Sequence, residues 1–155
     1  MNTLNMNQIT ALMKRFPPFE LSYETISHKK VSNEYQVTLA IPYGKKAFLW
    51  FSFYRDKNVC FCMELNREKK VTVMKIINMS HISNTIAYGT ILYGSICELE
   101  EKGDFFVIED VIYSEGVFLA KQPFSEKLGF LQNLMSNHPE TFVENQELPI
   151  VCPVM

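Results

Sequence analysis

Segments that would carry the chain into or across a membrane are missing from the sequence. The start, MNTLNMNQIT, has neither the basic region nor the apolar core of a signal peptide. The longest uninterrupted apolar stretch, residues 47–51, is far shorter than the roughly 20 residues that span a bilayer. We therefore expect a chain without a membrane span, in a reducing compartment of the cell.

Cysteine is also scarce, and its spacing provides no complete metal site. Cys60 and Cys62 form a C-x-C pair, but no second C-x-x-C or histidine pair is present to complete a zinc site. Because secretory features are missing, the even number of cysteines does not indicate disulfides. We expect no bound metal and four free thiols, at Cys60, Cys62, Cys97 and Cys152.

Common catalytic signatures are absent as well. The sequence contains no Gly-rich phosphate loop, no G-x-S-x-G, no H-E-x-x-H and no protein-kinase motif set. The three histidines, His28, His81 and His138, are far apart in polar surroundings and are expected at the surface. These patterns alone do not indicate an enzyme.

The chain does contain enough apolar sequence for a core. Of its 155 residues, 47% are hydrophobic and 21% are charged, which predicts one folded domain over 1–155 rather than a disordered chain. Aromatic residues reach 13%, with 12 Phe and 7 Tyr, a composition that favours β-strands.

The net charge of −2 conceals a division between the two halves of the chain. Residues 1–76 hold 12 Lys and Arg and 6 Asp and Glu, a net charge of +6. Residues 77–155 hold 3 and 11, a net charge of −8. The basic half is suited to phosphates, and the acidic half repels them.

Hydrophobic periodicity predicts an antiparallel, sheet-rich α+β fold. Residues 9–16 and 125–136 have helical spacing, and Ser125 is the expected N-cap of the second helix. Short turns separate segments with strand patterns, at residues 35–41, 47–54, 59–65, 71–77, 90–99, 105–113 and 117–120. We divide the chain into a helix with an extended lead-in, a core and a tail, at residues 1–30, 31–136 and 137–155.

Three segments occur in an order and at a spacing that resemble a known family. They are GTILYGSI at 89–96, FFVIEDVIY at 105–113 and PFSEKL at 123–128. The nucleotidyltransferase fold of mRNA guanylyltransferases and nucleic-acid ligases carries a G-T-hydrophobic-L-D-G-E strand, an F-x-x-F-D strand and a helix beginning P-F-S-E-R-L. The resemblance covers residues 33–135 and implies part of a nucleotidyltransferase core.

The nucleophile motif of that family, K-x-D-G-x-R, matches IPYGKK at residues 41–46. Gly44 keeps the glycine and Lys46 replaces the arginine, while Ile41 stands at the lysine position and Tyr43 at the aspartate position. Residues 40–48 are similar to guanylyltransferase-like proteins of large DNA viruses. The resemblance implies a viral protein that acts in the cytoplasm of the infected cell or in the virion.

The departures from the family predict loss of catalysis. The family's lysine amine attacks the α-phosphorus of the nucleotide, and Ile41 has no amine. Tyr93 and Ser95 stand where the family has acids that act on the ribose or the metal, and the later motifs have no counterpart. The resemblance therefore implies a catalytically inactive protein, without cofactor, that serves as a structural or accessory binding component.

Two alternatives remain open. One is a guanylyltransferase that uses GTP and Mg²⁺, either split with a partner chain or using Lys45 or Lys46. The other is a nucleic-acid-binding accessory domain that uses the basic first half. If nucleotide or phosphate binding is retained, its candidate residues are Lys45, Lys46, Phe106 and Asp110. Lys45 and Lys46 also fit a solvated turn, because turns are often charged. Phe106 and the aromatic run around Trp50 also fit the core, where such side chains usually lie.

The tail, residues 148–155, is apolar and contains two prolines. A shortened family domain exposes strand edges and apolar surface, so we expect a protein partner or self-assembly. The tail either contributes to that contact or folds back onto its own core. Because its prolines remove backbone donors, we expect it to dock through side chains rather than as a central strand.

Overall fold

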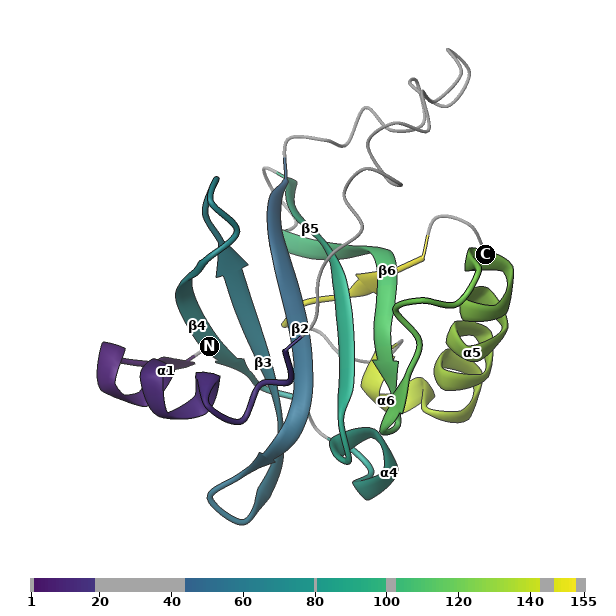
Figure 1. The fold of residues 1–155 in the computed structure, drawn as a ribbon, viewed down its shortest axis with the longest axis horizontal. Coiled ribbons are helices and arrows are strands. Elements are labelled where there is room, and N and C mark those ends of the chain that lie inside the picture. The colour runs from purple at the N-terminus through teal and green to yellow at the C-terminus, as the bar shows by residue number, and fades with distance from the viewer. Residues whose placement is uncertain (1, 19–43, 80, 100–102, 143–146, 153–155) are drawn as a thin grey trace.

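The computed structural model describes residues 2–18, 44–79, 81–99, 103–142 and 147–152 (Figure 1). Its strands are β1 (Asn2–Thr3), β2 (Lys45–Tyr54), β3 (Lys57–Leu65), β4 (Val71–Ile77), β5 (Thr90–Leu99), β6 (Gly103–Ser114), β7 (Val117–Phe118) and β8 (Ile150–Val151). Its helices are α1 (Met6–Met13), α4 (Asn84–Ala87), α5 (Phe124–Asn137) and α6 (Pro139–Phe142). These described elements confirm an α+β fold.

One sheet runs through the described residues in the order β1-β4-β3-β2-β5-β6-β7, and β8 also pairs with β6. All neighbours are antiparallel except β6 and β8, which are parallel. The strand predictions over 47–54, 59–65, 71–77, 90–99 and 105–113 are confirmed. The predicted strand over 117–120 extends only over β7, and the one over 35–41 lies outside the described residues.

The helix starts differ from those predicted. Helix α1 begins at Met6 because Asn5 and Gln8 form a capping box, in which each side chain bonds to the backbone N–H of the other residue. The prediction that Ser125 caps α5 is wrong. The carbonyl of Pro123 accepts the N–H groups of Glu126 and Lys127 at 3.0 and 3.1 Å, so the helix already begins at Phe124.

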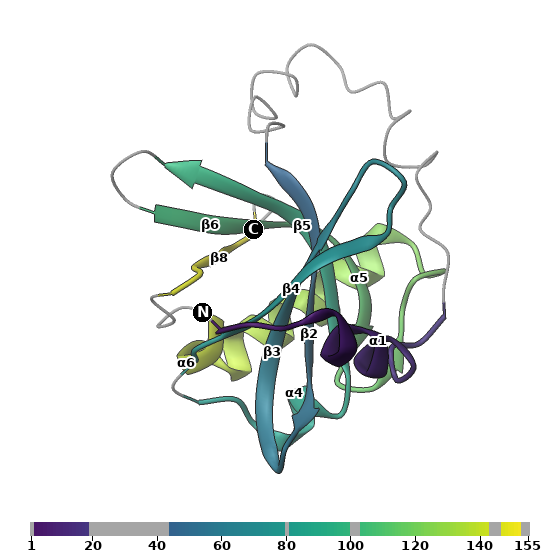
Figure 2. The same cartoon turned by 90° about the vertical axis from the view of Figure 1, so that its left-hand side faces the viewer.

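Helices cover both faces of the sheet, with α1 in front of it and α5 behind it in Figure 2. Because β2 lies between these layers, residues 47–52 are buried without interruption. Phe51 faces α6, where its ring centroid lies 5.6 Å from that of Phe142. Trp50 faces the other way, 5.1 Å from the ring of Phe16 after α1. The core interpretation of Trp50 is confirmed.

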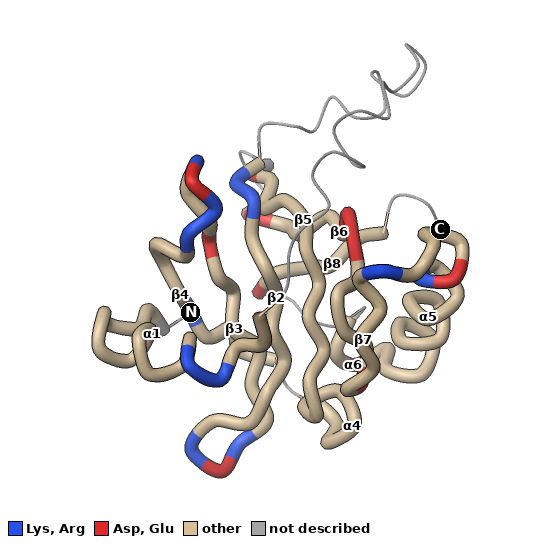
Figure 3. Tube along the Cα trace, viewed as in Figure 1, with Lys and Arg blue, Asp and Glu red and all other residues tan. Residues whose placement is uncertain are grey.

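The charge division of the sequence becomes a division in space. The basic first half supplies β2, β3 and β4, which are adjacent in the sheet, and the acidic second half supplies β5 and β6. Figure 3 shows lysines and arginines concentrated at the ends of β2, β3 and β4.

The described part of the tail packs against its own sheet. Leu148 and Ile150 are buried in the core between the sheet and α5. Ile150 pairs with Phe106, whose N–H donates to the Pro149 carbonyl at 2.8 Å. Of the two interpretations of the tail, the structure supports folding back. The tail does form a short strand, but only at the outer side of β6.

Among the described residues, none of the helices combines the length and the hydrophobicity that a membrane span needs.

Candidate functional site

Three strands bring Lys46, Ser95 and Glu109 together on the face that also carries α1. The Lys46 Nζ lies 2.7 and 2.8 Å from the two Glu109 carboxylate oxygens and 2.9 Å from the Ser95 Oγ. Ser95 also donates a hydrogen bond to Glu109. Lys46 and Ser95 are directly opposite each other on β2 and β5. We call these three residues the Lys46 cluster.

Strand alternation in β6 directs Glu109 toward this cluster, next to a β-bulge. Tyr93 pairs with Asp110 and Gly94 pairs with Ile108, so Glu109 is an extra residue on β6. Phe106 and Ile108 belong to the core on the α5 side, so the regular alternation of a strand directs Glu109 to the α1 side. Glu109 therefore reaches Lys46, while Asp110 is directed to the opposite face.

Asp110 forms a buried ion pair with α5. The Lys127 Nζ lies 2.8 Å from the Asp110 Oδ1 and donates to the Ala120 carbonyl at 3.1 Å. The same Asp110 oxygen accepts the Val111 N–H at 2.8 Å. Both charged side chains are about nine-tenths buried, so the pair attaches α5 to the sheet.

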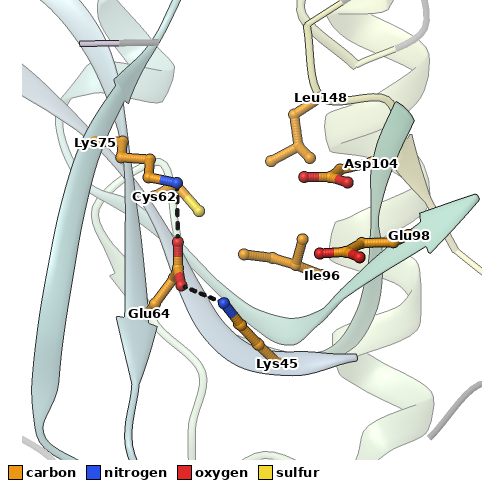
Figure 4. A pocket seen from close by; sticks show the side chains of 8 residues that line it. All are labelled: Lys45, Cys62, Glu64, Lys75, Ile96, Glu98, Asp104 and Leu148. Carbon is orange, nitrogen blue, oxygen red and sulfur yellow. Dashed lines mark ion pairs between the residues drawn. The ribbon is translucent and has the colours of Figure 1, made fainter. Parts of the chain in front are cut away.

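Lys45 lines a small polar pocket of about 80 Å³ on the face that carries α5 (Figure 4). Glu64 lies between two lysines there, 3.6 Å from the Lys45 Nζ and 3.3 Å from the Lys75 Nζ. Glu98 and Asp104 are paired across β5 and β6 and form the opposite wall. The volume is far below the roughly 300 Å³ at which ligand pockets usually begin.

The structure does not gather the four predicted binding residues at one place. Lys46 lies on the α1 face, and Lys45 and Asp110 lie on the α5 face. Phe106 is fully buried in the core on that second face, so its ring cannot stack on a base. Sequence reasoning gave no role to Glu64 or Lys127, because only strand pairing and helix packing bring them to their partners.

The acids of the two candidate regions are paired with lysines. Glu109, Asp110 and Glu64 each form an ion pair. Within the described ranges, no group of three or more His, Cys, Asp or Glu is placed to hold a metal.

Of the histidines, His138 is partly buried, and its Nε2 lies 3.4 Å from the Glu115 Oε2. His28 lies outside the described residues.

Burial makes three of the cysteine thiols poor nucleophiles. It raises the pKa of Cys60 well above the usual value and raises the pKa of Cys62 to about 12. The pKa of Cys97 is raised by burial and by the nearby Glu109 carboxylate. Because the thiolate is the reactive form, these side chains stay protonated and inert at neutral pH.

We expect thiol-specific labelling of the folded protein to modify Cys152 alone at pH 7.5. Cys152 is partly exposed, and the other three are buried with raised thiol pKa values. Mass spectrometry after brief treatment with iodoacetamide should show one adduct, which disappears in Cys152→Ser. Two or more rapid adducts in the native protein would contradict this arrangement, and urea should expose all four.

No protein-family model matches this sequence, and no curated protein matches it. The guanylyltransferase resemblance therefore depends on its motifs, while the α+β architecture stands on the structure itself.

Proposed function

We propose that this chain is a guanylyltransferase-like protein of a large DNA virus that has lost nucleotide transfer and acts by binding. Under this proposal the sheet is a scaffold for a structural or accessory component. Function then depends on the surface rather than on a covalent intermediate.

The arrangement of the motif residues supports the proposal. Lys46 belongs to the segment matched to the nucleophile motif, and Ser95 belongs to the strand matched to G-T-L-L-D-G-E. Motifs that serve one nucleotide site must bring their side chains close together in space. Lys46 and Ser95 meet this condition, since they are opposite each other and their side chains lie 2.9 Å apart.

The observation that carries the loss of catalysis is the internal pairing of the charged groups. Lys46 pairs with Glu109 at 2.7 Å, Asp110 with Lys127 at 2.8 Å and Lys45 with Glu64 at 3.6 Å. A nucleophilic amine has to be unpaired and aimed at phosphorus, and misplacement by about 1 Å is costly. Ile41, at the lysine position, lies outside the described residues, but its side chain has no amine in any conformation.

Incubation with radiolabelled GTP or ATP and Mg²⁺, followed by a denaturing gel, tests the proposal. We expect no labelled protein band, because no free amine occupies the nucleophile position. An active guanylyltransferase of the same family, run in parallel, shows that the assay detects the phosphoramidate. A band that disappears in Lys45→Ala or Lys46→Ala would overturn the proposal and establish relocated catalysis.

A further inference from the structure

A groove of about 350 Å³ opens on the α1 side of the sheet, at the end of β2 that lies near α4. Four separate parts of the chain form it: the segment after α1, β2, the α4–β5 junction and the β6–β7 region. Its lining includes Arg15, Trp50, Phe53, Tyr88 and Tyr113. In volume it falls within the roughly 300–1,000 Å³ that is typical of ligand sites.

Arg15 is the single charged residue in the described lining of this groove. Its guanidinium carbon lies 5.7 Å from the Trp50 ring centroid, and its Nη2 donates to the Ser52 Oγ at 2.9 Å and to the Phe53 carbonyl at 2.8 Å. A guanidinium has five N–H donors, so these contacts orient it and leave donors for a ligand. Among the described residues no carboxylate forms an ion pair with Arg15.

Exposed aromatic rings lie near the Arg15 guanidinium. Tyr88 is 69% exposed and Phe53 is 40% exposed, with their rings edge to face at 6.2 Å. Tyr113, another lining residue, packs on Phe118, which is also 40% exposed, with the ring centroids 5.1 Å apart. Ring faces left in water are a common mark of a binding surface.

The neighbouring surface is basic. Lys14 precedes Arg15, and the β2–β3 turn carries Arg55 and Lys57 with one acid, Asp56. Figure 3 shows both groups of basic residues around the lower part of β2 and β3. This combination of exposed rings and surrounding cations matches the chemistry of a sugar–phosphate backbone with unpaired bases.

We propose that this groove binds single-stranded nucleic acid, with a base stacked on the aromatic side chains and the adjoining phosphate contacted by Arg15. Every base has a π-face, so the site accepts bases with little sequence preference. The proposal does not rest on the guanylyltransferase resemblance. The groove shares no residue with the Lys46 cluster or with the Lys45 pocket, and it goes beyond the binding role proposed above by naming a site and a ligand class.

Trp50 makes the groove directly observable, because it is the one tryptophan of the chain. Fluorescein-labelled dT₁₂ and rU₁₂ serve as probes, followed by anisotropy and by quenching of Trp50 fluorescence. We expect saturable binding with quenching, weakened as salt rises because phosphate contacts release counterions. A 12-base-pair duplex, whose bases are already stacked, should bind more weakly.

Two groove variants and two matched controls locate the binding. Tyr88→Ala and Arg15→Gln should each weaken binding of dT₁₂ by about tenfold. Phe130→Ala on α5, which removes a ring that is 41% exposed, and Arg67→Gln in the exposed β3–β4 turn should leave affinity unchanged. Tyr88 is largely exposed, so its variant stays informative if loss of the Arg15 hydrogen bonds destabilises the fold.

Four outcomes would overturn the proposal. The first three are absence of Trp50 quenching, an affinity for the duplex equal to that for dT₁₂, and unchanged affinity for dT₁₂ in Tyr88→Ala. The fourth is displacement of dT₁₂ by polyglutamate as effective as displacement by unlabelled dT₁₂, which would indicate a surface that recognises charge alone. Saturation by UMP at the same concentration as the oligomers would assign the groove to free nucleotides instead. The GTP-labelling assay is independent of all these readouts. A negative result for the groove therefore leaves the proposed loss of nucleotide transfer unaffected, and the reverse also holds.

Discussion

Replacing Gly94 with alanine is expected to abolish the observed pairing of β5 and β6. A Cβ at this position would overlap the Val107 carbonyl oxygen and lie 2.9 Å from its carbonyl carbon. Both atoms belong to the backbone of the neighbouring strand, so no rotamer change relieves the overlap. Overpacking in a core costs about 1–3 kcal/mol, and we expect a larger loss here because the ladder itself must shift. Urea denaturation measures the change.

A matched control for this variant is Gly129→Ala on α5. No atom comes within 4 Å of a Cβ built on Gly129, and the residue is exposed. Alanine is favoured over glycine in a helix by about 0.8–1.0 kcal/mol, so this variant should be slightly more stable than the parent. Equal unfolding midpoints for Gly94→Ala and the parent protein would show that the β5–β6 register is different from the one observed.

Removing the Asp110 carboxylate is expected to cost about 3–5 kcal/mol of the free energy of unfolding, because Asp110→Ala leaves Lys127 charged, buried and unpaired. The pair is separated by 2.8 Å, and neither side chain is more than about one-tenth exposed. Denaturant titration at pH 7 measures the loss. A residue kept for nucleotide binding, with no structural role, would show little change in stability.

Two further variants separate the charge effect from the loss of volume. Replacing both partners, Asp110→Leu with Lys127→Met, removes the unpaired charge and should restore most of the stability lost in Asp110→Ala. Glu68→Ala breaks an ion pair whose two side chains are about three-quarters exposed, and it should change stability by less than about 1 kcal/mol. If the double variant is as unstable as Asp110→Ala, the effect comes from packing rather than from charge.

Local patterns in the sequence were sufficient to predict most strands. In β3 and β4 the predicted spans, 59–65 and 71–77, agree with the structure within two residues because short polar turns bound them. The uninterrupted apolar run of β2 indicated burial on both faces, and helices do cover both sides of that strand. Alternation and turns depend on neighbouring residues, which is why a single sequence contains them.

Short helices and helix starts were predicted less well. Helix α4 has four residues, too few to produce a periodic pattern, and its N-cap Ser83 was not recognised. The start of α5 depends on Pro123, whose backbone is extended and whose carbonyl accepts two helix N–H groups, without a side-chain cap. These ends are set by one or two hydrogen bonds rather than by the repeated spacing that sequence analysis detects.

The candidate site was predicted in part. Lys46 and Ser95, which lie at motif positions, are neighbours in the sheet, whereas sequence analysis gave no role to Glu109. Its contact with Lys46 depends on the register of β2, β5 and β6, and a one-residue change of register reverses the face on which a side chain lies. No pattern within β6 itself predicts that register.

The amino-acid sequence alone therefore predicted the α+β class, five of the strand spans and the absence of an amine at position 41, since each depends on residue type or on neighbours in the chain. Tertiary structure decided which charges pair, which face each strand residue occupies and where a groove opens. Arg15, Trp50, Tyr88 and Tyr113 are far apart in sequence. They line one groove because β2, β5 and β6 are adjacent in the sheet and Arg15 hydrogen-bonds to β2. Contacts between distant segments follow from strand order, and local patterns do not encode strand order.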